Sequence, residues 1–251
     1  MITVSGMPIH MDIIEQYHPS GIEGKTVRIL QASSSVYNYG SLEQLDFELK
    51  LRRSTVEASR ALNNSGLYFR VFRDVFCNPE YWSRTDEGGF LTKEGVSPYH
   101  AVKDIFVNGA SYGTECATAI VIVFYGAVLD FFPEALFNRI YRRIYLMNWQ
   151  HLDSSLGIMQ IREPNDYFPG DCRYFKNPDV DPATPEWQGE NAIDLGNGLY
   201  YGHGMGIRPA ERIIDALNSK RILGSTTSAY LMLQATRLNA RQLWRLYNSL
   251  Q

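Results

Sequence analysis

An uninterrupted apolar run over residues 117–129 constrains this fold more than any other stretch of the sequence. The run lies in GTECATAIVIVFYGAVLDFF and meets no charged residue before Asp130, so a helix formed from it is apolar on every side. It is shorter than the roughly 18 apolar residues that a membrane-spanning helix needs. We therefore expect a buried core helix, beginning near Thr114, against which other elements pack.

Length and composition are those of a globular protein. With 251 residues, 45% of them hydrophobic and 20% charged, the chain can bury a sizeable core and does not belong to the disordered class. No internal repeat, low-complexity tract or long linker divides it. We expect a single domain over residues 1–251.

The charge pattern disfavours some partners and compartments. The formal net charge is −3 and the basic residues are scattered, so we expect neither nucleic acid nor an anionic membrane as a partner. The N-terminal stretch has no basic region followed by an apolar run, so no secretory signal is expected. Three cysteines without such a signal favour free thiols in a reducing compartment over a disulfide framework.

The first half of the chain predicts helices after a short irregular start. Residues 1–40 suggest only extended pieces and polar turns. Capping residues and glycine stops predict helices over 41–66 and 97–109. The buried central helix comes next, and a further helix follows Pro133 with one apolar face formed by Leu136, Ile140 and Ile144.

The second half predicts mostly strands. Residues 172–175 are typical of a strand, and two further strands, 192–195 and 199–201, flank a Gly-Asn-Gly turn that signals a hairpin. A helix near 209–219, a strand near 229–235 and a short terminal helix capped at Asn239 complete the chain. Helices first and strands later indicate an α+β fold.

Cys116 stands directly before the apolar run and after Glu115. An inert buried thiol is one interpretation, because free cysteine is among the most buried residue types. A nucleophile is the other, because the unpaired N–H groups and the dipole at a helix N-terminus favour a thiolate. The buried helix behind the cysteine would supply a rigid platform for catalysis.

A cysteine nucleophile needs a base, and the second half offers one. The segments PGDCRYFKNP and GENAIDLGNGLYYGHG resemble the sheet of bacterial papain-like cell-wall hydrolases. In that family the strand before the Gly-Asn-Gly-type turn opens on the catalytic histidine, whose place is taken here by Glu190. The resemblance implies a papain-like core, with the nucleophile at the N-terminus of a buried helix packed on an antiparallel sheet, and Glu190 as the base.

A carboxylate base and a thiol need matched pKa values. Their ordinary values differ by roughly four units, which corresponds to about 5–6 kcal/mol against proton transfer. We expect burial to raise the pKa of Glu190 and the helix N-terminus to lower that of Cys116. Glu115 is either a second base or a favourable negative charge at the helix N-terminus.

A resemblance over a longer part of the chain indicates which reaction the protein catalyses. ECATAIVIVFY, GDCRYFKNPDVDPATPEWQGEN and YYGHGMGI, with FELKLR at 47–52 and SAYLMLQATRL at 228–238, together resemble the bacterial spore-coat transglutaminases of Bacillus-type organisms. The resemblance covers nearly the whole chain. It implies a calcium-independent protein-glutamine gamma-glutamyltransferase with Cys116 as nucleophile, Glu190 as base and Glu115 as auxiliary acid.

The same resemblance implies a biological setting. The partners are spore coat proteins, which supply glutamine and lysine side chains that become cross-linked through a cysteine thioester. The enzyme is made in the mother-cell cytoplasm and then deposited in the spore coat. We expect a monomer without cofactor.

Other residues fall into a group with a proposed passage role and a group with a proposed orienting role. The resemblance implies aromatic walls around the catalytic passage at Phe69, Trp149, Trp187 and Tyr174, although most aromatic residues of any chain belong to its core. His203 and Asn191 either orient Glu190 or serve as structural residues at the ends of strands. The remaining histidines and the cysteines show no metal-ligand spacing, so we expect no metal.

Two other functions remain compatible with these residues. A papain-like cysteine hydrolase, either a peptidase or a glutamine deamidase, would use the same groups with water as the acceptor. A non-catalytic coat component would keep the fold for assembly alone. The joint presence of Cys116, Glu190 and the aromatic set disfavours the second of these.

Overall fold

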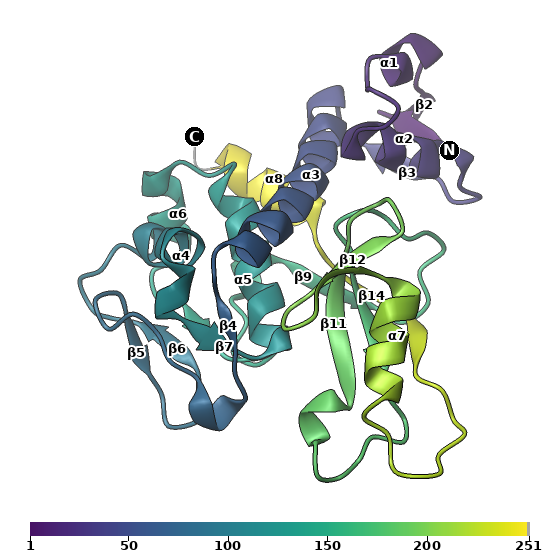
Figure 1. The fold of residues 1–251 in the computed structure, drawn as a ribbon. Coiled ribbons are helices and arrows are strands. Elements are labelled where there is room, and N and C mark those ends of the chain that lie inside the picture. Colours follow the sequence, from purple (N-terminus) through teal and green to yellow (C-terminus); the bar gives the residue numbers. More distant parts are fainter. Residues whose placement is uncertain (250–251) are drawn as a thin grey trace.

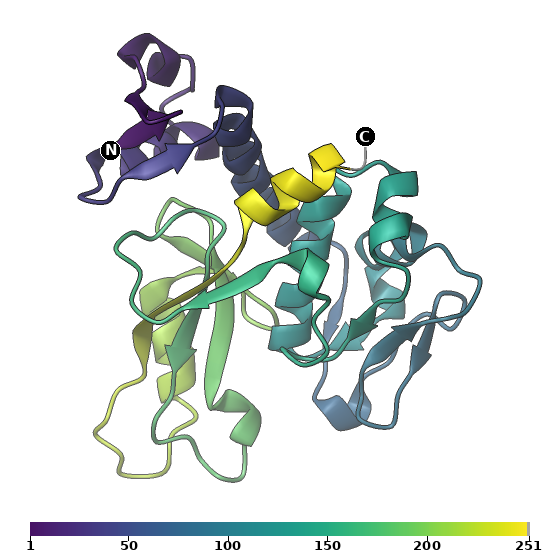
Figure 2. The ribbon, with the colours of Figure 1, turned by 180° about the vertical axis from the view of Figure 1, so that it is seen from behind.

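The computed structural model describes residues 1–249 and sets a layer of helices beside a six-stranded sheet (Figures 1 and 2). The helices are α1 Met11–Glu15, α2 Ile22–Ala32, α3 Leu42–Asn64, α4 Pro98–Val107, α5 Cys116–Leu129, α6 Glu134–Ile140, α7 Ala210–Asn218 and α8 Ala240–Ser249. Four 3-10 turns are η1 Phe72–Asp74, η2 Gly109–Ser111, η3 Ser154–Leu156 and η4 Pro185–Trp187.

The strands form one large sheet and three small ones. The large sheet has the order β13-β12-β11-β10-β14-β9 and is antiparallel throughout. Its strands are β9 Ile158–Ile161, β10 Cys172–Lys176, β11 Gly189–Asp194, β12 Leu199–Gly202, β13 Gly206–Pro209 and β14 Tyr230–Leu238. The small sheets contain β1 Ile2–Val4, β2 Met7–Pro8, β3 Tyr37–Tyr39, β4 Tyr68–Phe69, β5 Trp82–Arg84, β6 Phe90–Thr92, β7 Gly113–Thr114 and β8 Tyr145–Leu146.

The expected core helix is α5, and it packs against α3, α4 and strand β11. Its residues from Ala117 to Tyr125 are all buried, as the uniform apolar run predicts. The helix begins at Cys116 because Glu115 adopts extended backbone and caps it. Within residues 1–249, no helix has the length and apolar content required to cross a membrane.

The large sheet confirms the α+β prediction. The hairpin β11–β12 turns through Gly196 and Gly198, which have φ of +74° and +77°, values that favour glycine. One face of the sheet joins the main core around α5, whereas α7 covers the other face (Figure 1). On that second face Ile213 and Leu217 of α7 pack against Phe175.

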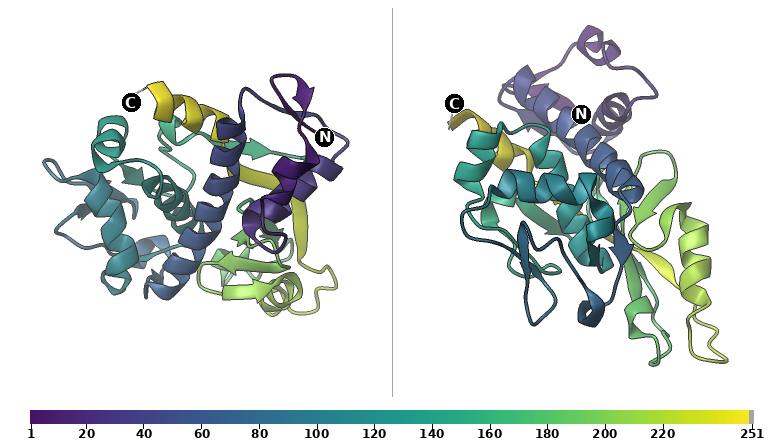
Figure 3. Two further views of the ribbon diagram at one scale, coloured as in Figure 1. Left: turned by 90° about the horizontal axis from the view of Figure 1, so that it is seen from above. Right: turned by 60° about the vertical axis from the view of Figure 1, so that its left-hand side comes forward.

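The N-terminal segment departs from the prediction of short extended pieces alone. Helices α1 and α2 and the sheet β2-β1-β3 lie beside α3 (Figures 1 and 3), and Leu30 packs with Leu45 and Leu49 of α3. Helix α2 escapes detection because its buried face includes Gly24 and Thr26, which interrupt the apolar pattern.

The helix after Pro133 is shorter than its apolar pattern suggests. Helix α6 ends at Ile140, because Tyr141 leaves helical geometry with φ −101° and ψ 72°. Ile144 is buried, but it lies beyond the helix, in the segment that leads to β8. The predicted helical face over these residues is therefore wrong in its last turn. The expectation of a single domain over residues 1–251 stays a prediction, and residues 250–251 lie outside the described part.

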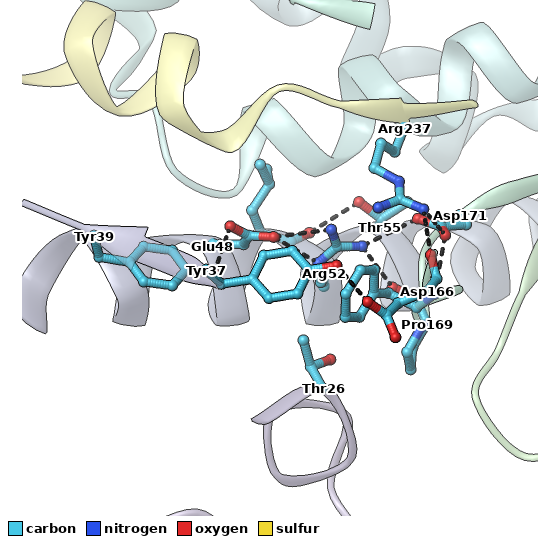
Figure 4. A network of polar contacts seen from close by, with 12 residues as sticks. Thr26, Tyr37, Tyr39, Glu48, Arg52, Thr55, Asp166, Pro169, Asp171 and Arg237 are labelled. Atoms are coloured by element: carbon cyan, nitrogen blue, oxygen red, sulfur yellow. Dashed lines mark hydrogen bonds and ion pairs between the residues drawn. The ribbon is translucent and has the colours of Figure 1, made fainter. Parts of the chain in front are cut away.

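A buried ion network joins α3 to the sheet (Figure 4). Asp171, fully buried before β10, accepts hydrogen bonds from Arg52 Nη1 at 3.1 Å and from Arg237 Nη2 at 2.6 Å. Arg52 also pairs with Glu48 at 2.9 Å, and its guanidinium lies 4.3 Å from the centre of the Phe168 ring. Burying these charges is costly, so each depends on its partner.

His203 makes a second link, between the end of β12 and strand β4. Its Nε2 donates to the carbonyl oxygen of Tyr68 at 3.2 Å, so Nδ1 is free to accept from the Tyr201 hydroxyl at 3.3 Å. Burial lowers the pKa of His203 to about 4, and the ring is therefore neutral near pH 7.

Replacing Asp171 with Asn should lower the free energy of unfolding by about 3–5 kcal/mol, because two buried guanidinium groups lose their shared carboxylate. Urea unfolding at pH 7.5 measures the difference. Asp215→Asn is the control, because it removes the exposed Asp215–Arg212 pair and should cost less than about 1 kcal/mol. Equal losses in the two variants would contradict the role of the buried network.

Folding stability should fall as the pH drops, because the pKa of His203 is lower in the folded chain than in the unfolded chain. The unfolded histidine titrates near its usual 6.5 and the folded one near 4, so between these values the unfolded chain binds more protons. Between pH 7.5 and 4.5, wild type should lose about 2–3 kcal/mol more of its unfolding free energy than His203→Gln. Urea unfolding of both proteins at the two pH values tests this, and parallel losses would show that the histidine is not buried as a neutral ring.

Candidate active site

A pocket of about 790 Å³ opens at the N-terminus of α5. Its walls come from β4 and η1, from the segment after β8, and from the sheet with the loop that precedes β11. Three of the four aromatic residues expected around a catalytic passage line it, namely Phe69, Trp149 and Tyr174. Cys116 lies among them and keeps part of its surface exposed.

Trp187 is not among the residues that line this pocket, and its place in the passage stays a prediction. It packs instead against the cluster under α7, and Lys220 Nζ lies 5.2 Å from its ring centre. Its neighbours Glu186 and Gln188 line the pocket. Trp187 belongs to η4, where successive side chains turn by about a third of a circle, so adjacent residues point in different directions.

Glu115 caps helix α5 with both carboxylate oxygens. Oε2 accepts from the N–H of Ala117 at 2.5 Å, and Oε1 accepts from the N–H of Thr118 at 2.8 Å and from the Thr118 hydroxyl. This geometry matches the interpretation of Glu115 as a favourable charge at a helix N-terminus. Burial, the largest influence, raises the pKa of its carboxyl.

The same cap fixes one pocket wall. The Thr118 hydroxyl accepts from the N–H of Asn148 at 2.7 Å, and Asn148 Oδ1 accepts from the N–H of Trp149 at 2.6 Å. Asn148 holds a positive φ of 53°, an uncommon conformation that these bonds stabilise. The position of the Trp149 wall therefore depends on the helix cap. Sequence reasoning missed Thr118 and Asn148, because only the tertiary fold brings them together.

Glu190 is the second residue of β11 and is only 5% exposed. Within residues 1–249 its Oε1 has no hydrogen-bond partner. Burial, followed by the charge of Glu115, raises the pKa of Glu190 well above its ordinary value, against the lowering effect of a hydrogen bond from the His203 backbone. The predicted rise in this pKa is confirmed.

Two glycines of the segment YYGHG make room for this arrangement. A side chain at Gly202 would place its Cβ 2.7 Å from Glu190 Oε1, and one at Gly204 would place its Cβ 2.8 Å from the Phe69 ring. Real Cβ atoms do not approach so closely. The Gly-His-Gly spacing was therefore the available signal that the backbone passes close to functional side chains here.

The expected lowering of the Cys116 pKa is wrong. Burial raises it most, and the charges of Glu190 and Glu115 raise it further, whereas hydrogen bonds from Asn191 lower it. The helix N-terminus cannot compensate, because the carboxylate of Glu115 already occupies it. Cys116 is therefore a thiol near neutral pH.

Asn191 is the predicted orienting residue that contacts the thiol directly. Its Nδ2 lies 3.8 Å from Cys116 Sγ, and its Oδ1 lies 3.9 Å from Cys172 Sγ. His203 does not orient Glu190 through its ring, whose nitrogens bond to Tyr68 and Tyr201. All three cysteines are free thiols. Across residues 1–249, no three His, Cys, Asp or Glu side chains gather closely enough to hold a metal ion.

Comparisons with known proteins agree on one family. A family model described as protein-glutamine gamma-glutamyltransferase matches residues 1–247. A protein of that name from Bacillus mycoides (strain KBAB4) is 42% identical over 244 residues, which is 97% of this chain and 88% of the relative. One from Bacillus cereus (strain 03BB102) is 41% identical over 242 residues, covering 96% of this chain and 87% of the relative.

A solved structure extends the similarity to the fold. The transglutaminase from Geobacillus stearothermophilus, without its C-terminal extension, has a TM-score of 0.77 and 48% sequence identity to this chain. The match covers 81% of this chain and 97% of that one. Both sequence and structure therefore lead to the same assignment: the chain belongs to the protein-glutamine gamma-glutamyltransferase family.

Proposed function

We propose that this transglutaminase forms γ-glutamyl-ε-lysine bonds between spore coat proteins through a thioester on Cys116. The observation that carries the mechanism is a thiol at the N-terminus of a buried helix, close enough to the buried carboxylate of Glu190 for that charge to raise its pKa. Within residues 1–249 the Oε1 atom of Glu190 has no hydrogen-bond partner. A helix N-terminus that carries the cysteine and packs on an antiparallel sheet also supports a papain-like core.

The first half-reaction forms the thioester. Glu190 removes the proton from Cys116, and Sγ attacks the carboxamide carbon of a substrate glutamine, while the carbonyl electron pair moves onto oxygen. As that pair returns, the C–N bond breaks and the nitrogen takes the proton back from Glu190, so ammonia leaves. The carboxylate acts first as base and then as acid.

The second half-reaction transfers the acyl group. A lysine amine gives a proton to Glu190 and attacks the thioester carbon, the C–S bond breaks, and the sulfur regains a proton from Glu190. Water competes with the amine, so a dry site favours transfer over hydrolysis. The aromatic walls at Phe69, Trp149 and Tyr174 support this preference.

Glu115 has a subordinate role in this proposal. Its oxygens already accept hydrogen bonds at the helix N-terminus, so it acts mainly through its charge, which raises the pKa of Glu190. The same charge also raises the pKa of the Cys116 thiol, so it disfavours the ionised form of both groups. As an auxiliary acid, Glu115 would serve only when Glu190 is absent.

The proposed setting follows the resemblance to spore-coat enzymes. Coat proteins are the glutamine and lysine substrates, the enzyme is made in the mother-cell cytoplasm, and it works as a monomer in the coat. Calcium and other cofactors take no part in the proposed steps, each of which uses only side chains of this chain and the substrates.

A hydrolase with the same residues is the second candidate. Glutamine deamidation shares the first half-reaction. It differs only in that water, and not a lysine amine, attacks the thioester. The pocket has charged and amide side chains in its lining, but its aromatic walls, Phe69, Trp149 and Tyr174, favour the amine acceptor because they limit the access of water. The ratio of amine incorporation to ammonia release separates the two functions.

Wild type should incorporate a fluorescent primary amine into a glutamine-containing protein, whereas Cys116→Ala should show none, because sulfur forms the covalent intermediate. Activity should be unchanged in calcium chelator. Cys77→Ala is the matched control for the loss of a thiol and should retain incorporation, because Cys77 is a free cysteine outside the pocket lining. Ammonia release without incorporation would favour the deamidase, and activity that needs added calcium would refute calcium independence.

Glu190→Gln should slow thioester formation by about 10²-fold or more, because the amide keeps the shape but cannot accept the proton. Single-turnover ammonia release measures this step. The acidic limb of the wild-type pH–rate profile should lie above pH 4.5, since the pKa of Glu190 is raised, and it should vanish in the variant. A near-normal Glu190→Gln combined with an inactive His203→Ala would place the base on the histidine.

A further inference from the structure

Thioester formation places a negative charge on the carbonyl oxygen of the substrate. Cys116 and Asn191 are positioned to stabilise this oxyanion. During attack, the carbonyl oxygen of the glutamine takes up charge, and preorganised N–H donors at that point lower the barrier. The N–H of Cys116 is one such donor: it belongs to the first helical residue, which has no acceptor within the helix. A second donor is needed for a complete oxyanion site.

Asn191 occupies the required place. It lines the pocket, and its Nδ2 lies 3.8 Å from Cys116 Sγ, a long contact for a hydrogen bond to the sulfur itself. In the tetrahedral intermediate, the substrate carbon is bonded both to this sulfur and to the negatively charged oxygen, so the oxygen lies two bonds from the sulfur. An oxygen directed toward Asn191 then comes within the roughly 2.7–3.1 Å that an oxyanion donor needs.

The other side-chain amides of the pocket are less suitable. Asn148 and Gln188 both line it, but neither makes a contact with Cys116 Sγ within residues 1–249. Asn148 already uses its Oδ1 to hold the N–H of Trp149. Asn191 also belongs to the strand that carries Glu190, so the donor and the base are held by one rigid element.

Cys172 fixes which end of the Asn191 amide faces the reaction. Its Sγ lies 3.9 Å from Asn191 Oδ1 across the β10–β11 ladder. Cys172 is 3% exposed, and burial raises its pKa, so it remains a thiol. Its single S–H has two acceptors within reach, Asn191 Oδ1 and, at 3.8 Å, the carbonyl oxygen of Arg173. With the carbonyl end of the amide directed at this S–H, the NH₂ end points toward Cys116.

We propose that Asn191 Nδ2 and the Cys116 N–H form the oxyanion site of this enzyme, and that the Cys172 thiol positions the Asn191 amide. This inference rests on the proposed thioester mechanism. In the step concerned, the S–C bond forms as the carbonyl π pair moves onto oxygen, which both donors bind. When the pair returns, the C–N bond breaks and ammonia leaves with the proton from Glu190.

Two reactions of the same sulfur test the proposal. Thioester formation, followed as single-turnover ammonia release from a glutamine-containing peptide, passes through an oxyanion. Alkylation by iodoacetamide displaces iodide and develops no such oxygen, so it reports only thiolate formation and access. For Asn191→Ala, we expect ammonia release to fall by about 10²–10³-fold and alkylation at the same pH to fall at least tenfold less.

The controls separate the possible failures. Gln188→Ala removes another pocket amide and should change ammonia release by less than threefold. Equal losses of both reactions in Asn191→Ala would mean that Asn191 acts on the thiolate alone, and no loss would mean that it does not act; either result overturns the proposal. If wild type itself releases no ammonia, the proposed function fails instead.

Substitutions at Cys172 test the positioning role. Cys172→Ala removes the donor to Asn191 Oδ1 and should lower the kcat of ammonia release by about 3–10-fold with little change in KM. Cys172→Ser keeps a donor and should restore at least half of the loss. Equal defects in both variants, or a defect that follows thermal stability alone, would show that Cys172 only fills space.

Discussion

The capped N-terminus of α5 is the constraint on which the site depends. A buried helix leaves its first N–H groups without acceptors, and Glu115 satisfies two of them with its own carboxylate. Thr118 then connects this carboxylate to Asn148 and so to the Trp149 wall. The position of Cys116, its electrostatic environment and one wall of the pocket therefore all depend on the Glu115 cap.

This cap also affects the electrostatics of the Cys116 thiol. Burial raises the pKa of Cys116 most, the charge of Glu190 comes next, and the Glu115 carboxylate on the helix N-terminus raises it further. In the proposed mechanism, moving the proton from Cys116 to Glu190 leaves the net charge of the pair unchanged, so the buried pair can exchange it without bringing a new charge into the core. An unpartnered Glu190 Oε1 is a suitable receiver. The chemistry is thus compatible with low solvent access.

The sequence predicts those features that depend on neighbouring residues. Uniform apolarity identifies α5, serine caps identify the starts of α3 and α4, and paired glycines identify the β11–β12 hairpin. Helix α2 is missed, because its buried face includes Gly24 and Thr26, which interrupt the apolar pattern. The His18 backbone packs so closely on Gly24 that no larger side chain fits there. Glu190 is found through a motif, whereas the direction of Trp187 and the rise in the Cys116 pKa depend on residues far away in sequence.

The site itself is divided between the two halves of the chain. Cys116 and Glu115 belong to the helical half, whereas Glu190 and Asn191 belong to the sheet. His203 bonds across this division to Tyr68, the residue before Phe69 in the pocket wall, and the backbone of His203 also donates to Glu190. A buried, neutral histidine thereby joins strand β4 at the pocket wall to the sheet that carries Glu190. Because Cys116 meets Asn191 across the division and residues of both halves line the pocket, the pocket is complete only when the helical half and the sheet are packed together.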